Sequence, residues 1–279
     1  MKGPNSLSDQ RDVLSRWRTY ECALSTDITK AYNSMRTGEL ERHVRRVVWR
    51  HGKSDGEWKH YGYNTVSFGD KPAGVFLDIV INETAERFKD IDPVAAQKIV
   101  NDRYVDDIAT GGSPSEVRQM AGELVNSSDV NNFGTNGTLS QIFSKGNLNL
   151  KAVVVSGEDN QNIINKLGKY VLGVKWLSAS DLISIEMYSQ AVIDELLNTD
   201  SLDTVILTLR TILGIVNKPH DLLGLVTPIT IRAMVAYRDL FRIDPALGWD
   251  DDIPIEEKKK WVVIFRIFRE VSKVSGWSA

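Results

Sequence analysis

The sequence Val100-Asn-Asp-Arg-Tyr-Val-Asp-Asp-Ile-Ala109 carries two adjacent carboxylates, Asp106 and Asp107, between apolar neighbours. This composition predicts a tight β-hairpin centred on Tyr104-Val-Asp-Asp107. Neighbouring carboxylates repel each other, which raises a pKa, and a divalent cation relieves that repulsion. An Asp-Asp pair is a weak signal by itself, because Asp250-Asp-Asp252 is another, which we interpret as a solvated turn.

A third acidic residue, Asp27, ends the apolar segment Cys22-Ala-Leu-Ser-Thr-Asp-Ile28, which predicts a buried strand. A carboxylate there is costly unless something compensates its desolvation. If this strand lies beside the hairpin, Asp27 and Asp106 face the same metal ions. Oxygen ligands completed by substrate phosphates are typical of Mg²⁺ sites in phosphoryl and nucleotidyl transfer. The alternative is that Asp27 is the N-cap of the helix that follows.

The order of predicted elements indicates the fold class. Helical spacing predicts a helix after Asp27, and aromatic and Val residues predict a β-hairpin arm further on. A capping box at Ser113-Pro-Ser-Glu116 begins another helix. The other expected elements are an amphipathic piece at Leu14 to Tyr20, a helix containing Tyr32, Met35, Leu40, Val44, Val47 and Val48, the arm from Trp58 to Phe68, a helix from Val75 to Phe88 and a strand from Leu148 to Val155. This order predicts an α+β domain in which helices cover one face of an antiparallel sheet.

The C-terminal part of the sequence is different in character. Helical patterns dominate from Ser189 onward and end in a helix over Ile255 to Val274. We therefore expect two domains, residues 1–183 and residues 184–279, the second mostly helical.

Length, charge and composition narrow the class of protein. The chain has 279 residues, with 34 Lys and Arg against 37 Asp and Glu, a net charge of −3 that argues against a uniformly basic coat for nucleic acid. The single cysteine, Cys22, is typical of a reducing intracellular setting. No apolar run approaches the ~20 residues that span a bilayer, and the first residues lack the apolar core of a signal peptide. We expect a soluble intracellular protein with no membrane partner, in a cytoplasmic particle or the nucleus.

Three segments together resemble successive motifs of the reverse transcriptase palm. They are Asp27-Ile-Thr-Lys-Ala-Tyr32 for D-x-x-x-A-[YF], Phe68-Gly69 for a glycine turn that opens a helix, and Tyr104-Val-Asp-Asp107 for Y-x-D-D. Tyr170-Val-Leu-Gly-Val-Lys-Trp176 is similar to the primer-grip hairpin. The sequence at 68–74, with Leu222 to Pro228 and Gly248-Trp-Asp250, resembles the BEL/Pao-type LTR retrotransposons. The resemblance covers about residues 12 to 255.

The resemblance implies a polymerase palm followed by a helical thumb or connection region. It also implies an RNA-directed DNA polymerase that adds dNMP from a dNTP to a DNA primer on an RNA or DNA template, with two Mg²⁺ ions, or Mn²⁺ in their place. Asp27, Asp106 and Asp107 would be the catalytic metal ligands, with the main-chain carbonyl of Ile28.

The same resemblance assigns substrate contacts. It implies nucleotide binding by Tyr32, Gly69 and Lys151. It also implies primer binding by a second set, which consists of Tyr104, Leu172, Gly173 and Trp176. Alternatives stay open from the residues alone: Tyr32 as a core aromatic, Gly69 as a turn glycine, Lys151 as a solvated strand residue and Trp176 as a strand-edge packing residue. Phe68 stands where retroviral enzymes carry Gln, so that side chain's contacts do not transfer.

Few residues precede Asp27, and we expect the fingers to be missing and the protease, RNase H and integrase segments to be absent. The alternative function is therefore a non-catalytic remnant of a retroelement polyprotein that acts as a nucleic-acid or protein interaction module. A nucleotide cyclase is a third, weaker possibility. The sequence has two basic clusters. We interpret both mainly as solvated helix faces, with phosphate contact as the alternative. The first consists of Arg42, Arg45, Arg46, Arg50, His51 and Lys53, and the second of Lys258, Lys259, Lys260, Arg266 and Arg269.

Overall fold

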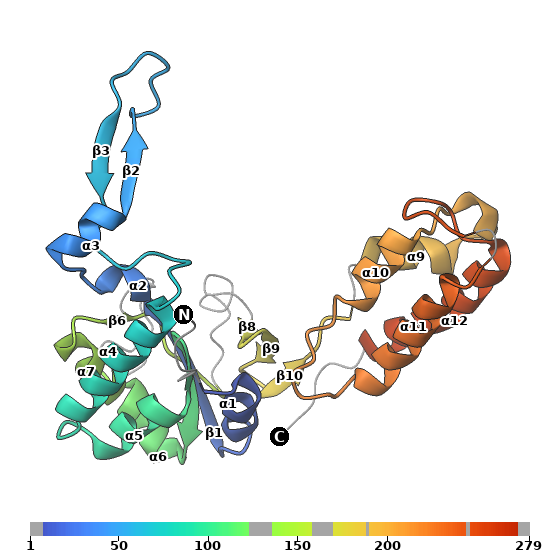
Figure 1. Ribbon diagram of the computed structural model, residues 1–279. Helices are drawn as coiled ribbons and strands as arrows, with labels where there is room; N and C mark the ends of the chain where they lie inside the picture. Colours follow the sequence, from blue (N-terminus) through green and yellow to red (C-terminus); the bar gives the residue numbers. More distant parts are fainter. Residues whose placement is uncertain (1–7, 123–135, 158–169, 188–189, 244–245, 273–279) are drawn as a thin grey trace. The chain divides into compact units, whose positions relative to one another are not determined.

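A computed structural model describes residues 8–122, 136–157, 170–187, 190–243 and 246–272. The chain divides into two compact units, residues 1–167 and residues 168–279 (Figure 1). Helices and antiparallel sheets are both present, so the expected α+β class is confirmed. The division lies earlier in the chain than the expected domain boundary at 183/184, and that boundary stays a prediction.

The first unit is built on a five-stranded antiparallel sheet with β1 (Cys22–Thr29) at its centre. β5 (Asp107–Gly112) pairs with one edge of β1, and β4 (Arg103–Tyr104) pairs with β5. β6 (Asn149–Leu150) and β7 (Val154–Val155) both pair with the other edge of β1. The single strand expected from Leu148 to Val155 is thus two short strands.

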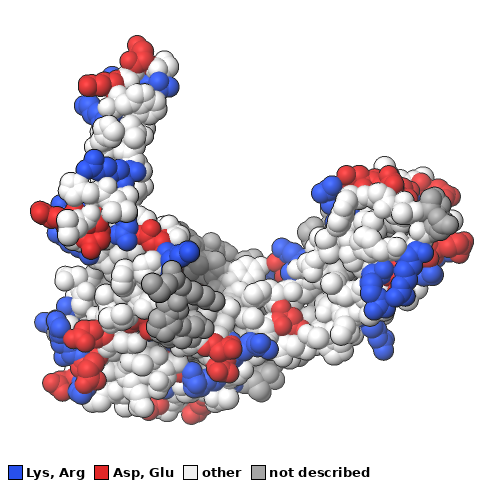
Figure 2. All heavy atoms as spheres, in the orientation of Figure 1, with Lys and Arg blue, Asp and Glu red and all other residues white. Residues whose placement is uncertain are grey.

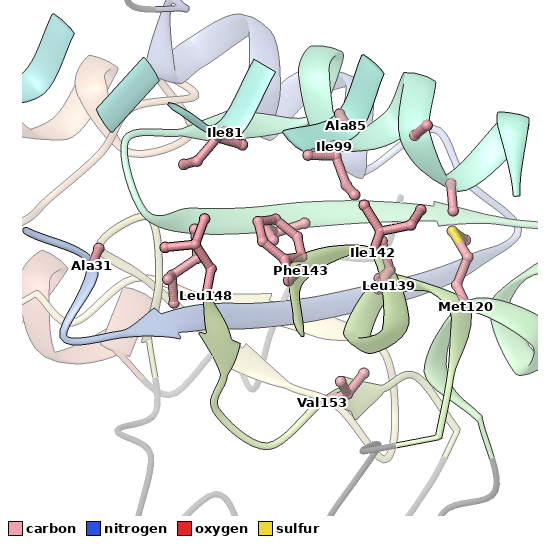
Figure 3. Packing of buried hydrophobic residues seen from close by; sticks show 14 of the residues in the cluster. Ala31, Ile81, Ala85, Ile99, Met120, Leu139, Ile142, Phe143, Leu148 and Val153 are labelled. Atoms are coloured by element: carbon pink, nitrogen blue, oxygen red, sulfur yellow. The ribbon is translucent and has the colours of Figure 1, made fainter. Parts of the chain in front are cut away.

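Four helices cover one face of this sheet. They are α4 (Ala73–Arg87), α5 (Pro93–Asn101), α6 (Pro114–Ala121) and α7 (Thr138–Lys145). Their buried side chains form one hydrophobic cluster with alternate residues of β1 and β5, among them Leu24, Ile28 and Ile108. Figure 3 shows Ile81 and Phe143 in this cluster. These four helices cover one sheet face as expected, although α5 was not expected and a further helix, α1 (Gln10–Trp17), packs against β5 outside this cluster.

Other expected elements of the first unit are also present. α1 (Gln10–Trp17) contacts β5 and buries Val13, Leu14 and Trp17. The capping box predicted at Ser113 begins α6, where the Glu116 carboxylate accepts the Ser113 main-chain N–H at 2.8 Å.

The prediction of one long helix after Asp27 is wrong. The segment instead forms α2 (Ala31–Ser34), α3 (Glu39–Val44) and then strand β2 (Arg46–Trp49), which pairs with β3 (Lys59–Gly62). Met35 is buried, but Leu40, Val44, Val47 and Val48 are all exposed, so the apolar residues at helical spacing do not form one buried helix face. A short run of β-branched and aromatic side chains is compatible with a strand as well as with a helix. Here the pairing with β3 selects the strand. The expected hairpin arm exists, but it begins at Arg46.

The second unit begins with an antiparallel sheet of β8 (Tyr170–Val171), β9 (Val174–Leu177) and β10 (Leu182–Ser184). Four helices and a short 3₁₀-helix follow and share one hydrophobic core, as the sequence predicts for this region. They are α9 (Gln190–Asn198), η1 (Leu202–Thr204), α10 (Leu209–Val216), α11 (Thr227–Leu240) and α12 (Ile255–Ser272). Within the described ranges, none of the helices has the length and apolar character needed to cross a membrane.

Candidate functional site

The β4–β5 hairpin carries its two carboxylates on a two-residue turn. Tyr104 pairs with Asp107, so Val105 and Asp106 form the turn. Val105 has φ +57°, an unfavourable conformation for a β-branched residue that costs on the order of 1–3 kcal/mol. Two hydrogen bonds hold the turn: the Arg103 guanidinium donates to the Val105 carbonyl at 3.1 Å, and the Ile28 N–H donates to the Asp106 carbonyl at 3.1 Å.

Residues of α4 hold the side chain of Arg103 in place. Its side chain is buried and donates to the Asp78 carboxylate at 2.5 Å and to Asn82 Oδ1 at 3.0 Å, both on α4. A buried ion pair between the sheet and α4 thus anchors the turn that carries Asp106. Sequence reasoning missed these residues, and the available signal was an arginine directly before Tyr104 in the predicted hairpin.

The register between β1 and β5 brings the third carboxylate to this turn. Asp27 lies directly opposite Asp107 in the antiparallel pair. Since Leu24, Ile28 and Ile108 belong to the helix-covered core, strand alternation places Asp27 and Asp107 on the other face of the sheet. The structure therefore brings together the three predicted catalytic carboxylates. It also rules out Asp27 as the N-cap of α2, because that position is Lys30.

The grouping of these carboxylates changes their acidity. Burial, followed by repulsion from Asp27 and Asp106, raises the pKa of Asp107 from 3.8 to about 6. Burial and then repulsion from Asp27 also raise the pKa of Asp106. The charge of Lys151 acts in the opposite direction on both groups. The site therefore favours one or more bound protons, or another source of positive charge.

Lys151 supplies one positive charge at the site. Its main-chain N–H donates to the Asp27 carbonyl at 2.7 Å, and its ammonium forms an ion pair with Asp27 Oδ2. The other carboxylate oxygen, Asp27 Oδ1, is buried and has no hydrogen-bond partner within the described part of the chain. A buried carboxylate oxygen without a donor is unusual and leaves an acceptor for a cation.

Carboxylate oxygens are the ligands that a hard divalent cation prefers. This site offers carboxylate oxygens that repel each other, one of which, Asp27 Oδ1, is buried without a hydrogen-bond partner among the described residues. Mg²⁺ usually takes only one or two carboxylates and keeps water or phosphate oxygens as its other ligands. Among the residues that the structure describes, no group of three or more His, Cys, Asp or Glu side chains has the arrangement of a metal site.

Tyr32 lies close to Phe68, the residue directly before Gly69 in the predicted glycine turn. The rings of Tyr32 and Phe68 meet edge to face, with centroids 5.1 Å apart. Burial and then the charge of Asp106 raise the pKa of the Tyr32 hydroxyl, so this side chain is within electrostatic range of the carboxylates. Gly69 has φ +85°, and no atom lies within 4 Å of the position that a Cβ would take. Glycine is favoured there by its backbone conformation, and the space beside it is open.

The other predicted primer contacts lie in the second unit. Leu172 and Gly173 form the β8–β9 turn, both with positive φ. Trp176 is buried and donates from Nε1 to Asp181 at 2.8 Å, so it packs as the alternative expected, but in the central strand β9 and not at a strand edge. The roles of these residues in primer binding stay predictions.

A polar cleft of about 540 Å³ beside α5 is a weaker candidate. Asp102 accepts from Arg16 at 2.9 Å and from the Tyr20 hydroxyl at 2.7 Å, and Lys98 donates to the Gly111 carbonyl at 2.5 Å. Its main charged groups already satisfy one another, which indicates a structural network.

The first basic cluster does not lie on one helix, whereas the second lies on α12, where Lys259, Lys260 and Arg266 are exposed as expected. In the first cluster, Arg42 lies on α3, Arg46 on β2 and Arg50 in the turn after it. In the second cluster, Lys258 is buried, while Lys259 pairs with Glu256.

Comparison with known proteins adds no assignment: no family model matches the sequence, and no curated protein matches it.

Proposed function

We propose that this chain is a reverse transcriptase module of a BEL/Pao-like retroelement, which transfers dNMP to a primer 3′-hydroxyl. One observation carries the proposal: Asp27 lies opposite Asp107 in the β1–β5 register, with Asp106 on the adjoining turn. Three carboxylates from two separate motifs are thereby grouped on the sheet face away from the helical core. This geometry adds spatial grouping to a resemblance that rests on sequence motifs alone.

In this proposal Asp27, Asp106, Asp107 and the Ile28 carbonyl would hold two Mg²⁺ or Mn²⁺ ions. When bound, such ions lower the pKa of the attacking hydroxyl and neutralise charge on the triphosphate. The protein's own part is positioning. Arg103 and the Ile28 N–H fix the turn, and Tyr32 would border the nucleotide. Lys151 would exchange its contact with Asp27 for a phosphate oxygen.

The alternative is a non-catalytic remnant, and the Lys151 ion pair is the observation in its favour. An ammonium that already neutralises Asp27 makes a cation less necessary there. In a remnant, the carboxylates would stay protonated at pH values above their ordinary pKa and would bind no divalent ion.

Primer extension on an RNA template in Mg²⁺ or Mn²⁺ tests the proposal. We expect extension by the chain and loss of at least about 10³-fold with Asp106→Asn, because the charge that holds the metal is removed. Asp203→Asn is the matched control, since Asp203 is an exposed carboxylate in the second unit. Absence of extension by the unaltered chain, despite binding of primer–template, would contradict the enzymatic proposal.

Calorimetric titration with Mn²⁺ separates the two functions without relying on activity. The polymerase proposal predicts binding that Asp106→Asn abolishes and Asp203→Asn leaves unchanged. A remnant predicts no saturable binding in any of the three proteins.

A further inference from the structure

The arm, which we define as β2, β3 and the connecting residues 50–58, is a two-stranded sheet that buries neither face. Every residue of β2 and β3 is exposed. Figure 1 shows the arm extending away from α3 and from the helices of the first unit. Antiparallel sheets ordinarily pack one face against a core, and an isolated hairpin is only marginally stable in water. The arm therefore has the character of a surface that a partner covers.

Both faces of the arm carry aromatic rings. The register pairs Val47 with Tyr61 and Trp49 with Lys59, so these four side chains share one face. His51 joins this face, since its ring centroid lies 4.4 Å from that of Trp49 and 5.8 Å from that of Tyr61.

The other face repeats the combination of ring and cation. It carries Arg46, Val48 and His60 by the same register. Beyond the strands, the Arg50 guanidinium lies over the Trp58 ring, 4.8 Å from its centroid. Trp49 is 54% exposed and Trp58 is 56% exposed, values that are high for tryptophan.

The charge of the arm differs from that of the whole chain. Residues 46–62 contain the cations Arg46, Arg50, Lys53 and Lys59 against two acids, Asp55 and Glu57, whereas the whole chain has a net charge of −3. Figure 2 shows blue side chains along the arm and red ones close to its tip. A basic segment with exposed rings complements an anionic partner that offers flat apolar surfaces.

We propose that the arm binds single-stranded nucleic acid, with bases stacked on Trp49 and Tyr61 and phosphates held by Lys59 and neighbouring cations. Stacking on aromatic side chains requires unpaired bases, because a duplex already stacks its own, and basic residues then follow the backbone. A protein strand added to the arm's open edge would need only main-chain groups and would not explain the rings and cations. This inference does not depend on catalysis by the carboxylates.

Fluorescence anisotropy with labelled single-stranded RNA, single-stranded DNA and duplex DNA tests the proposal, in EDTA and without nucleotide. We expect the double variant Trp49→Val, Tyr61→Val to bind single strands at least about tenfold more weakly, since Val keeps the strand propensity and removes the rings. Trp249→Val is the matched control, because Trp249 is 50% exposed and lies in the second unit. Lys59→Gln should reduce the slope of log affinity against log salt by about 0.7.

Photocrosslinking of the unaltered chain gives a second measurement that needs no variant. A 5-bromouracil oligonucleotide should crosslink to peptides within residues 46–62. Unchanged affinity in the double variant, or crosslinks that all lie outside these residues, would overturn the proposal. So would a change of oligomeric state in the double variant with unchanged nucleic-acid affinity, since the arm would then bind protein. The anisotropy is measured in EDTA, without the metal ions that primer extension requires, so its outcome separates failure of this proposal from failure of the polymerase proposal.

Discussion

Lys151 contacts Asp27 through both its main chain and its side chain. The main-chain N–H donates to the Asp27 carbonyl at 2.7 Å, and the ammonium forms an ion pair with Oδ2 of the same residue. The strand pairing thereby fixes a cation beside a carboxylate that lies opposite Asp107. A divalent ion bound at Asp27 would be repelled by this ammonium and compete with it.

We therefore expect Lys151→Gln to bind Mn²⁺ more tightly at pH 8, by on the order of tenfold. The reason is that one unit charge a few Å away contributes about 1–4 kcal/mol at intermediate dielectric constants. Calorimetric titration measures the change, and Lys145→Gln, which removes an exposed lysine of α7, is the control. Equal or weaker binding by Lys151→Gln would show that the ammonium does not compete with the ion.

The raised pKa of Asp107 predicts a pH-dependent stability of the first unit. Its pKa is 3.8 in the unfolded chain and about 6 in the folded protein, so the folded protein binds more protons between these values. Stability therefore falls as pH rises from about 4 to about 6, by about 2–3 kcal/mol from this group. Asp107→Asn should remove this cost and stabilise the unit at pH 8 but hardly at pH 4.

Urea titration of the full chain, followed by hydrogen exchange of the β1 amides, measures this difference. Asp203→Asn should give the same small effect at both pH values. A gain for Asp107→Asn that is no larger at pH 8 than at pH 4 would show that the carboxyl is not held in its protonated form by the fold.

The Arg103–Asp78 ion pair predicts a strong non-additivity. Arg103→Met leaves the buried Asp78 carboxylate without its cation and should destabilise the first unit by about 3–5 kcal/mol. The double variant Arg103→Met, Asp78→Leu should recover most of this loss, because no charge is then stranded. Hydrogen exchange of the β5 amides measures both effects. Equal losses in the single and double variants would show that Asp78 is not the group that Arg103 compensates.

The local parts of the candidate site could be predicted from the sequence. The strand that ends near Asp27 and the turn at Asp106 follow from short-range patterns, and both are present. The pairing of Asp27 with Asp107 depends on a register between distant segments, and strand alternation alone does not fix a register. The contact between Asp27 and Lys151 and the support of the turn by Arg103 are non-local in the same way.

The segment after Asp27 shows why short apolar patterns mislead. Val44, Val47 and Val48 lie at helical spacing, yet β2 takes the last two into a hairpin whose faces are both exposed. Helical periodicity is informative when one face becomes buried, and here no buried face selects between helix and strand. In the second unit, by contrast, the last helix was predicted to begin at Ile255 and it does, because Trp261, Phe265 and Phe268 form a continuous buried stripe.

Lys258 gives a prediction that concerns the second unit alone. This residue is 2% exposed, and its ammonium donates to the Asp252 carboxylate at 2.6 Å and to the Val205 and Leu202 carbonyls at 2.7 and 3.2 Å. The ammonium thus ties α12 to the loop before it and to η1. Lys258→Met removes the donor of the buried Val205 carbonyl and should destabilise the unit by about 1–3 kcal/mol.

Lys259→Met is the matched control, because Lys259 is the next residue of α12 and is exposed in a pair with Glu256 that contributes less than about 0.5 kcal/mol. Hydrogen exchange of the α12 amides in the full chain measures both variants, while the β1 amides report on the first unit. We expect loss of protection in α12 with Lys258→Met only. Since the buried Val205 carbonyl would otherwise lose its donor, equal protection in the two variants would mean that the loop carrying Asp252 moves away at little cost.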